Sequence, residues 1–225
     1  MLRKRQGLLI TFEGIEGSGK STQSRLLADH LRASGLWVLE THEPGGTPLA
    51  EKIRDIFLSP KGQNRGRDTL TPECEASLVL ASRSQHVATV LLPALRQGAL
   101  VLCDRFTDST LAYQGFGRGL DLHNLKRFNR FVSQGLTPDV TFLFDLPVQQ
   151  GLARRHQDNH QNRIDRETAA FHLRVRKGYL TLAQQHKRRI KILDARRSPE
   201  TIACQLIDLA KPIIHRFQKA KRISN

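Results

Sequence analysis

The stretch Gly14-Ile15-Glu16-Gly17-Ser18-Gly19-Lys20-Ser21, followed by Thr22, fits the pattern G-x-x-x-x-G-K-[ST] of a phosphate-binding loop. The apolar run Leu8–Phe12 comes just before it, and leucines at helical spacing follow it. The glycines let backbone N–H groups approach phosphate oxygens without a Cβ in the way, and the start of a helix adds positive potential. We therefore expect Lys20 to reach the β- and γ-phosphates of a nucleotide and Ser21 to ligate Mg²⁺.

The length and composition suit one globular domain, and we expect a single α/β domain over residues 1–225. No apolar run approaches the roughly 18 residues of a membrane helix. We expect no signal peptide, because the apolar run near the start is short. The three cysteines, Cys74, Cys103 and Cys204, are scattered and lack metal-ligand spacing. They favour reduced thiols and a cytoplasmic protein.

The chain is strongly basic, with a formal charge of +15. Eight basic residues lie before the first acidic residue or after the last, and we assign basic tails to residues 1–7 and 218–225. Such tails give salt-sensitive affinity for polyanions, so a polyanion- or RNA-binding protein is an alternative from another functional class. The tails lack the interleaved aromatic residues of a base-stacking surface, and we expect no specific nucleic-acid partner.

Five apolar runs are predicted strands, and helical patterns lie between them. The runs are Leu8–Phe12, Trp37–Glu40, Leu100–Cys103, Val140–Phe144 and Ile190–Leu193. This alternation predicts a parallel sheet with helices on both faces. A long helix is predicted to start after Thr71 and to reach about Leu92, where Pro93 bends or ends it. The last helix is predicted to start after Ser198 and to reach about Phe217.

The active residues of parallel sheets gather at the carboxyl ends of the strands. The second strand is followed by a turn, Glu43-Pro44-Gly45-Gly46-Thr47, in which Thr47 is expected to cap a helix; a purely structural turn is the alternative. The third strand is followed by Asp104-Arg105, which we expect to serve Mg²⁺ and phosphate rather than to form a structural ion pair. The Asp194–Arg197 loop is placed to meet a nucleotide base.

Residues 151–167 read GLARRHQDNHQNRIDRE, a polar segment without apolar periodicity in its middle. A solvated loop is one interpretation. A mobile lid that brings Arg154, Arg155 and Arg163 over the phosphates is the other. His156 and His160 have a spacing that suits a metal, but no third ligand lies nearby in the sequence.

The strings FEGIEGSGKST, EPGGT, DRFTDSTLAYQGFGRG and PDVTFLFD give the chain a resemblance to bacterial thymidylate kinases from about Leu8 to Ile214. The resemblance implies a P-loop NTPase fold with a five-stranded parallel sheet. It also implies a cytoplasmic homodimer that uses ATP and Mg²⁺ to phosphorylate dTMP. The long helix after Thr71 and a helix near Asp121–Val132 are candidates for the dimer interface.

The resemblance also implies residue roles. The loop Gly14–Ser21 would hold the ATP phosphates, and Glu16 would meet the 3′-hydroxyl of dTMP. Arg105 and Arg54 would hold the dTMP phosphate, and Asp104 would organise Mg²⁺. The remaining acceptor-site residues that it implies are Arg83 at the thymine edge, Thr110 and Gln114 nearby, Tyr113 where a ribose 2′-hydroxyl would clash, and Glu43.

Several positions depart from the pattern of that family. Gly17 stands where eukaryotic-type enzymes have a loop arginine, so the catalytic arginines are expected to come from the lid. Val79 replaces the usual stacking phenylalanine, and His42 and Asn162 replace an arginine and an aspartate. His156 and Asp158 stand where some relatives carry arginine.

Two other kinases remain alternatives at this stage. A deoxynucleoside kinase would use Glu43 as the base for a 5′-hydroxyl. A kinase for another nucleoside monophosphate is the second, because Val79 weakens the expected base stacking.

Overall fold

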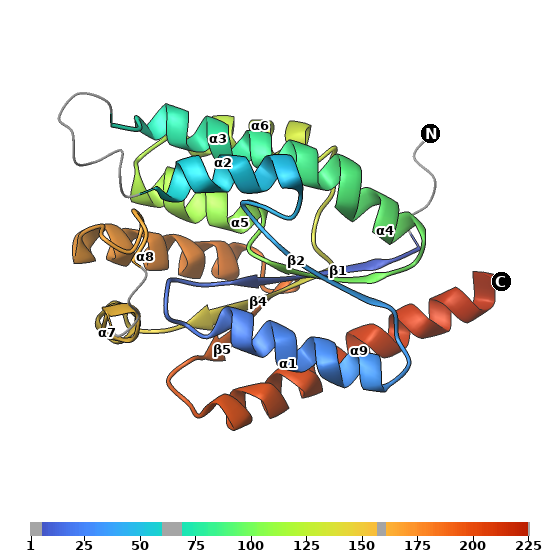
Figure 1. Ribbon diagram of the computed structural model, residues 1–225. Coiled ribbons are helices and arrows are strands. Elements are labelled where there is room, and N and C mark those ends of the chain that lie inside the picture. Colours follow the sequence, from blue (N-terminus) through green and yellow to red (C-terminus); the bar gives the residue numbers. More distant parts are fainter. Residues whose placement is uncertain (1–5, 60–68, 157–160, 225) are drawn as a thin grey trace.

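A computed structural model describes residues 6–59, 69–156 and 161–224 (Figure 1). Five strands form one parallel sheet in the order β2-β3-β1-β4-β5. The strands are β1 (Leu8–Glu13), β2 (Val38–His42), β3 (Leu100–Asp104), β4 (Val140–Asp145) and β5 (Ile190–Asp194). All five predicted strands are confirmed, with ends that differ by at most two residues.

Helices connect the strands and cover both faces of the sheet. They are α1 (Lys20–Ala33), α2 (Pro48–Leu58), α3 (Pro72–His86), η2 (Val87–Leu91), α4 (Leu92–Arg96), α5 (Thr107–Thr110), η3 (Leu111–Gly117), α6 (Leu122–Val132), α7 (Val148–His156), α8 (Ala169–Gln185) and α9 (Pro199–Ser224). Figure 1 shows α1 and α9 on one face and α2, α3 and α6 on the other. The predicted helix caps are confirmed, because Thr47 and Thr71 accept hydrogen bonds from backbone N–H groups in the first turns of α2 and α3.

Two predicted helix ends were wrong. The helix after Thr71 does not end near Leu92 but continues through a π-helical turn, η2, and through Pro93 to Arg96. A π turn widens the helix locally, which makes room at the point where proline removes a backbone donor. Helix α9 likewise runs past Phe217 to Ser224, with Pro212 inside it.

Two apolar clusters pack against the sheet. The larger one contains Phe12, Phe142 and Phe144 together with side chains from α1, α8 and α9. Leu9 and Val101 point to the other side, toward η2 and α4. Every residue of β1 is buried, because this strand is central and covered on both faces. The buried sheet fixes the carboxyl ends of β1, β2 and β3 at one edge.

Candidate active site

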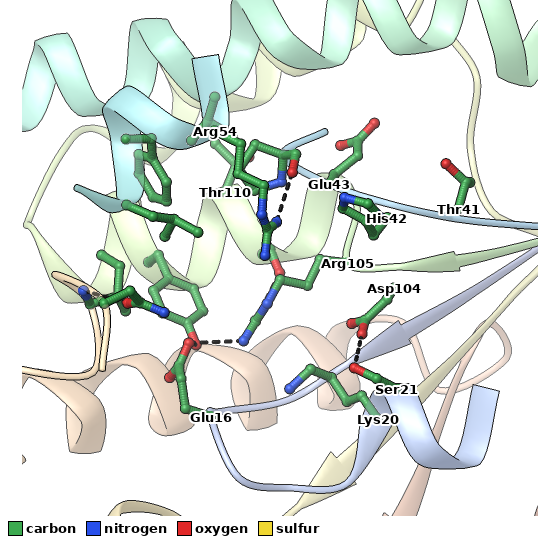
Figure 2. A pocket seen from close by; sticks show the side chains of 18 of the residues that line it. Glu16, Lys20, Ser21, Thr41, His42, Glu43, Arg54, Asp104, Arg105 and Thr110 are labelled. Carbon is green, nitrogen blue, oxygen red and sulfur yellow. Dashed lines mark hydrogen bonds and ion pairs between the residues drawn. The ribbon is translucent and has the colours of Figure 1, made fainter. Parts of the chain in front are cut away.

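A cavity of about 560 Å³ opens at this edge of the sheet (Figure 2). Its walls come from the loop after β1, the turn after β2 and the residues after β3. The predicted site residues that line it are Glu16, Gly17, Lys20, Ser21, Glu43, Arg54, Arg83, Asp104, Arg105, Thr110, Tyr113, Gln114 and Arg155. Most of the predicted side chains therefore meet in one place, as expected for strand ends in a parallel sheet.

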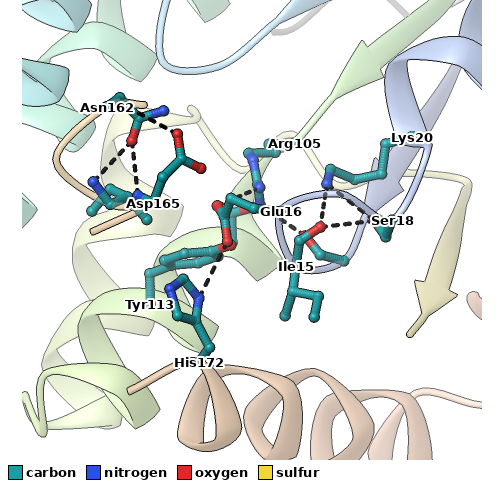
Figure 3. A network of polar contacts seen from close by, with 12 residues as sticks. Ile15, Glu16, Ser18, Lys20, Arg105, Tyr113, Asn162, Asp165 and His172 are labelled. Atoms are coloured by element: carbon teal, nitrogen blue, oxygen red, sulfur yellow. Dashed lines mark hydrogen bonds and ion pairs between the residues drawn. The ribbon is translucent and has the colours of Figure 1, made fainter. Parts of the chain in front are cut away.

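The loop after β1 has the predicted shape of a phosphate cradle. Gly14, Gly17 and Gly19 have positive φ angles, and α1 begins at Lys20. The Lys20 Nζ donates hydrogen bonds to the Ile15 carbonyl at 2.8 Å and to Ser18 Oγ at 3.2 Å (Figure 3). Burial and the nearby Arg105 charge lower the pKa of Lys20 to about 8. A bound anion would favour the charged form, so the loop is best suited to phosphate.

Ser21 and Asp104 form the candidate metal site. The Ser21 hydroxyl donates to Asp104 Oδ2 at 2.5 Å, and Asp104 Oδ1 is buried without a hydrogen-bond partner. Among the described residues, no three His, Cys, Asp or Glu side chains cluster tightly enough to hold an ion by themselves. Mg²⁺ is typically held by one or two protein oxygens together with waters and substrate phosphates. The hydroxyl, the carboxylate and the orphaned oxygen fit this ion.

Arg105 follows β3 in an uncommon backbone conformation, with a φ of +70°. Its Nη2 donates to Glu16 Oε1 at 2.9 Å, and its Nη1 donates to the Gly14 carbonyl at 3.0 Å. The Tyr113 hydroxyl donates to the same Glu16 oxygen at 2.6 Å. Burial opposes ionisation of Glu16, but the Arg105 charge and hydrogen bonds from His172 and Tyr113 hold its pKa well below the ordinary value. The pocket thus contains an ionised Arg105–Glu16 pair beside the phosphate loop.

Arg83 and Glu43 form a buried ion pair at the back of the pocket, with both side chains 1% exposed. Arg83 Nε donates to Glu43 Oε2 at 2.7 Å, and His86 Nδ1 lies 3.0 Å from Glu43 Oε1. Burial raises the pKa of Glu43, but the Arg83 charge and the His86 hydrogen bond outweigh it, so the pKa is lowered overall. Both oxygens of Glu43 are therefore engaged.

The other N–H groups of Arg83 are nearly all used as well. Its Nη1 donates to Thr110 Oγ1 at 2.7 Å and to Asn129 Oδ1, and its Nη2 donates to the Phe106 carbonyl at 3.0 Å. A guanidinium has five N–H groups. These contacts and the one to Glu43 use four, which leaves a single Nη2 donor for a ligand.

Arg54 and Gln114 also line the pocket. Arg54 Nη1 donates to the Pro44 carbonyl at 2.7 Å, and Gln114 Nε2 donates to the buried Glu75 at 2.8 Å. Val79 lies in the lining as a buried aliphatic side chain, without the ring face that stacking on a base requires.

The predicted lid, residues 151–167, begins as a helix, because residues up to His156 complete α7. Residues 157–160, with Asp158 and His160, lie outside the described residues. Arg154 Nη1 donates to the carbonyls of Gly17 at 3.2 Å and of Ala195 at 3.4 Å. This side chain therefore lies against the phosphate loop, although it does not line the cavity.

The other two lid arginines are held by carboxylates. Arg155 lines the pocket and makes a bidentate contact with Asp165, at 3.0 and 2.7 Å. Arg163 is only 5% exposed and is not part of the lining. It pairs with Glu75 at 2.8 Å and lies over the Phe57 ring, which holds it away from the phosphate loop.

The two polar departures from the family pattern have partners of their own. His42 Nε2 lies 2.9 Å from Glu51 Oε1. Asn162 Oδ1 accepts hydrogen bonds from the backbone N–H groups of Ile164 and Asp165, which shapes the turn after the lid.

Several buried polar residues near the pocket were not predicted, among them Glu13, Glu75 and His172. His172 Nδ1 lies 3.4 Å from Glu16 Oε2. Glu13 is the last residue of β1 and directly precedes the phosphate loop. A carboxylate at the end of an otherwise apolar central strand is a signal that the sequence did offer, because such a group needs buried partners.

Comparison with known proteins agrees with the phosphate-binding geometry of the pocket. The profile of the family described as thymidylate kinase matches residues 12–206. A thymidylate kinase from Pseudomonas putida (strain GB-1) is 48% identical over 210 residues, which cover 93% of this chain and 98% of the relative. One from Pelotomaculum thermopropionicum is 43% identical over 215 residues, which cover 95% of this chain and 97% of the relative.

A solved structure extends this likeness to three dimensions. The crystal structure of thymidylate kinase from Ehrlichia chaffeensis matches with a TM-score of 0.72 and 31% identity, covering 90% of this chain and 98% of that one. The chain belongs to the thymidylate kinase family.

Proposed function

We propose that this chain transfers the γ-phosphoryl group of ATP to dTMP, forming dTDP for dTTP synthesis. The observation that carries the proposal is the ionised Arg105–Glu16 pair, which lies beside the phosphate loop and shares Glu16 with the Tyr113 hydroxyl. A cation for a second phosphate and an anion for a sugar hydroxyl therefore stand next to a site for ATP. The family membership supports dTMP as the acceptor.

On the donor side, Gly14–Ser21 would bind the ATP phosphates, with the Lys20 ammonium on the β- and γ-phosphates. Ser21 and Asp104 would hold Mg²⁺, which supplies charge neutralisation to the phosphates when it is bound. The Asp104 Oδ1 without a hydrogen-bond partner supports this role. Lys20 then stabilises negative charge that develops on the transferred group.

On the acceptor side, Arg105 and Arg54 would bind the dTMP phosphate, and Glu16 would accept a hydrogen bond from the 3′-hydroxyl. The single N–H group of Arg83 that is left would donate to the thymine edge. Thr110 acts mainly through Arg83, because its hydroxyl oxygen accepts a hydrogen bond from Arg83 Nη1. Glu75 holds Gln114 in the same way, because it accepts a hydrogen bond from Gln114 Nε2.

The reaction needs no general base, because the attacking oxygen of dTMP is already ionised at neutral pH. This separates the proposal from phosphorylation of a 5′-hydroxyl, which requires a base. Glu43 would be the candidate base, but Arg83 and His86 engage both of its oxygens and lower its pKa. A carboxylate bound in this way is a poor proton acceptor, which disfavours a deoxynucleoside kinase.

A coupled ADP-release assay with purified protein tests the proposal. We expect turnover with dTMP to exceed that with dUMP, dCMP and GMP, and no turnover with thymidine. Lys20→Ala protein serves as the blank for contaminating kinases. Turnover only with thymidine, or a preference for another monophosphate, would overturn the assignment. Deletion of residues 1–5 and 218–225 should leave turnover unchanged, whereas a polyanion-binding protein would lose RNA affinity instead.

We further propose that the chain forms a homodimer through the face made by α2, α3 and α6, where α3 packs between the other two (Figure 1). Exposed apolar side chains gather on these helices, with Leu49 and Ile56 on α2 and Phe128 and Phe131 on α6. Phe131 is 80% exposed, which favours a contact with a second copy. Light scattering should give the mass of a dimer, and Phe131→Glu should give that of a monomer.

We place the protein in the cytoplasm, as the resemblance implies. Among the described residues, one helical run, Pro72–Arg96, is long and apolar enough to span a membrane by composition. Half of it is buried inside the protein, where it forms α3, η2 and α4 against the sheet. The buried half of its apolar window thus belongs to the core.

A further inference from the structure

Glu13 lies at the junction between the sheet and the phosphate loop and is fully buried. Its Oε1 accepts a hydrogen bond from the Phe106 N–H at 2.8 Å. Its Oε2 accepts from the hydroxyls of Ser109 at 2.6 Å and Tyr179 at 2.9 Å. Three elements therefore converge on this carboxylate: the residue after Arg105, helix α5 and helix α8.

The same two hydroxyls also contact Arg105. Its Nη1 lies 3.3 Å from Ser109 Oγ and 3.1 Å from the Tyr179 hydroxyl. A guanidinium only donates hydrogen bonds, so the hydroxyl oxygens act as acceptors toward Arg105. The two hydroxyl oxygens also lie 2.7 Å from each other, so one hydroxyl can donate to the other, and at least one donates to the ionised Glu13. A chain of hydrogen bonds thus runs from the Arg105 cation through two hydroxyls to the Glu13 anion.

We propose that Glu13 is a positioning residue that fixes the Arg105 guanidinium for the acceptor phosphate. The proposal rests on the proposed function, in which Arg105 binds that phosphate. Glu13 acts on Arg105 from two sides, because it orients the hydroxyls that receive Nη1 and it holds the backbone N–H of Phe106. The second contact secures the turn in which Arg105 has its uncommon positive φ.

The role requires a carboxylate and not merely a buried polar group. In a Glu13→Gln variant, an amide nitrogen would replace one oxygen and would bring donors instead of an acceptor. Facing the hydroxyls, that nitrogen would remove their shared acceptor, so at least one hydroxyl hydrogen would have to turn toward Arg105, which cannot accept it. If the nitrogen faced Phe106 instead, two donors would meet, and the hydrogen bond from the Phe106 N–H would be lost. Either orientation breaks part of the chain to Arg105 while the side chain keeps its size.

The alternative is that Glu13 only stabilises the fold, as a satisfied buried carboxylate. Asp108 provides the matched control, because it is also buried beside the sheet and makes two contacts with Arg189, at 2.6 and 2.9 Å. None of its contacts reaches Arg105, and its charge, which helps to raise the pKa of Glu13, matters little at a pH at which Glu13 is ionised. Asp108→Asn should therefore lower thermal stability without changing the affinity for dTMP.

The experiment measures binding of dTMP and of a non-hydrolysable ATP analogue by calorimetry at pH 8, where Glu13 is mainly ionised. We expect Glu13→Gln to weaken dTMP binding about tenfold or more, as for loss of a hydrogen bond to a charged group. The affinity for the ATP analogue should stay within about twofold, and Tyr179→Phe should give a smaller loss in the same direction. Tyr179→Phe also carries the test if Glu13→Gln fails to fold.

Equal losses for both ligands, or losses that match those of Asp108→Asn, would overturn the positioning role. A second readout needs no nucleotide: the guanidinium NMR signals of Arg105, assigned with Arg105→Lys, should be resolved in the wild type and averaged in Glu13→Gln. Unchanged signals would overturn the inference. If wild-type protein does not use dTMP, the proposed function fails, and these signals alone decide the role of Glu13.

Discussion

Replacing Gly17 with alanine should lower the free energy of unfolding by more than the left-handed backbone conformation of this residue alone would cause. Gly17 has a φ of +71°, and a Cβ there would lie 2.4 Å from the Gly151 carbonyl oxygen of α7. A Cβ on Gly151 would in turn lie 2.6 Å from the Glu16 carbonyl oxygen. Both obstacles are backbone atoms, which cannot move aside as a flexible side chain can. The phosphate loop and α7 are therefore packed against each other as two backbones.

Gly35 provides the reference, because it has a φ of +74° and nothing within 4 Å of its Cβ position. The shared left-handed conformation costs about 1–2 kcal/mol for alanine. Overpacking against α7 should add about 1–3 kcal/mol at Gly17. In a domain of this size each kcal/mol lowers Tm by about 2–4 °C. We expect Tm to fall by about 4 °C in Gly35→Ala and by about 10 °C in Gly17→Ala.

Calorimetric unfolding of the two variants checks this difference, and equal decreases in Tm would refute the reasoning. The close packing of Gly17 on α7 also has a consequence for activity, which the ADP-release assay can measure. Gly17→Arg would copy the loop arginine of eukaryotic-type enzymes, but the packing on α7 leaves no room for it. It should not rescue the activity that Arg154→Ala removes, and a rescue would contradict the packing argument.

Lys20→Ala should lower kcat by about 10²–10³-fold, as for removal of one stabilising donor, and a kcat near that of the wild type would refute the donor-site assignment. Arg154→Ala should lower the single-turnover rate more than Arg155→Ala does, because Arg155 is already paired with Asp165; equal losses would contradict this ranking. Burial raises the pKa of Glu13 from 4.5 to about 7, so the folded protein keeps a proton that the unfolded chain releases. The free energy of unfolding should then fall by about 3 kcal/mol as the pH rises from 4.5 to 7. Urea titrations at several pH values should show this decrease in the wild type and not in Glu13→Gln; the same pH dependence in both proteins would contradict the raised pKa. Val79→Phe should tighten dTMP binding by about 1–3 kcal/mol through base stacking, measured by calorimetry, and weaker binding would mean that the ring does not reach the base.

The sequence was sufficient for the parts of the fold that depend on local pattern. The strands stood out as apolar runs, and Thr47 and Thr71 were recognisable as helix caps because capping depends on a few adjacent residues. The convergence of Lys20, Asp104 and Arg105 on one pocket followed from the parallel sheet, since each residue comes directly after a strand or opens the next helix.

The partner of each charged side chain could not be predicted in the same way. Arg163 was expected over the phosphates, but its side chain pairs with Glu75, which comes from a helix far away in the sequence. Glu13 depends on residues of α5 and α8 that meet only in the folded chain. Such pairs are set by three-dimensional packing, and one sequence gives no period or spacing that would reveal them.

These pairings divide the predicted cations into two groups. Arg83, Arg105, Arg155 and Arg163 each contact a carboxylate of the chain in the described residues. Lys20, Arg54 and Arg154 instead donate hydrogen bonds to carbonyl or hydroxyl oxygens of the described part of the chain.

Within the part of the chain that the structure describes, the second group can meet phosphates without breaking an ion pair. Under the proposed function, Lys20 belongs to the donor loop, Arg54 faces the acceptor pocket, and Arg154 lies against Gly17, where eukaryotic-type enzymes have a loop arginine. Burial lowers the pKa of Lys20 to about 8, and in the proposed reaction a bound phosphate would favour its charged form. In the proposed reaction, positive charge would thereby be concentrated where negative charge grows during transfer, which is the requirement for catalysis without a general base.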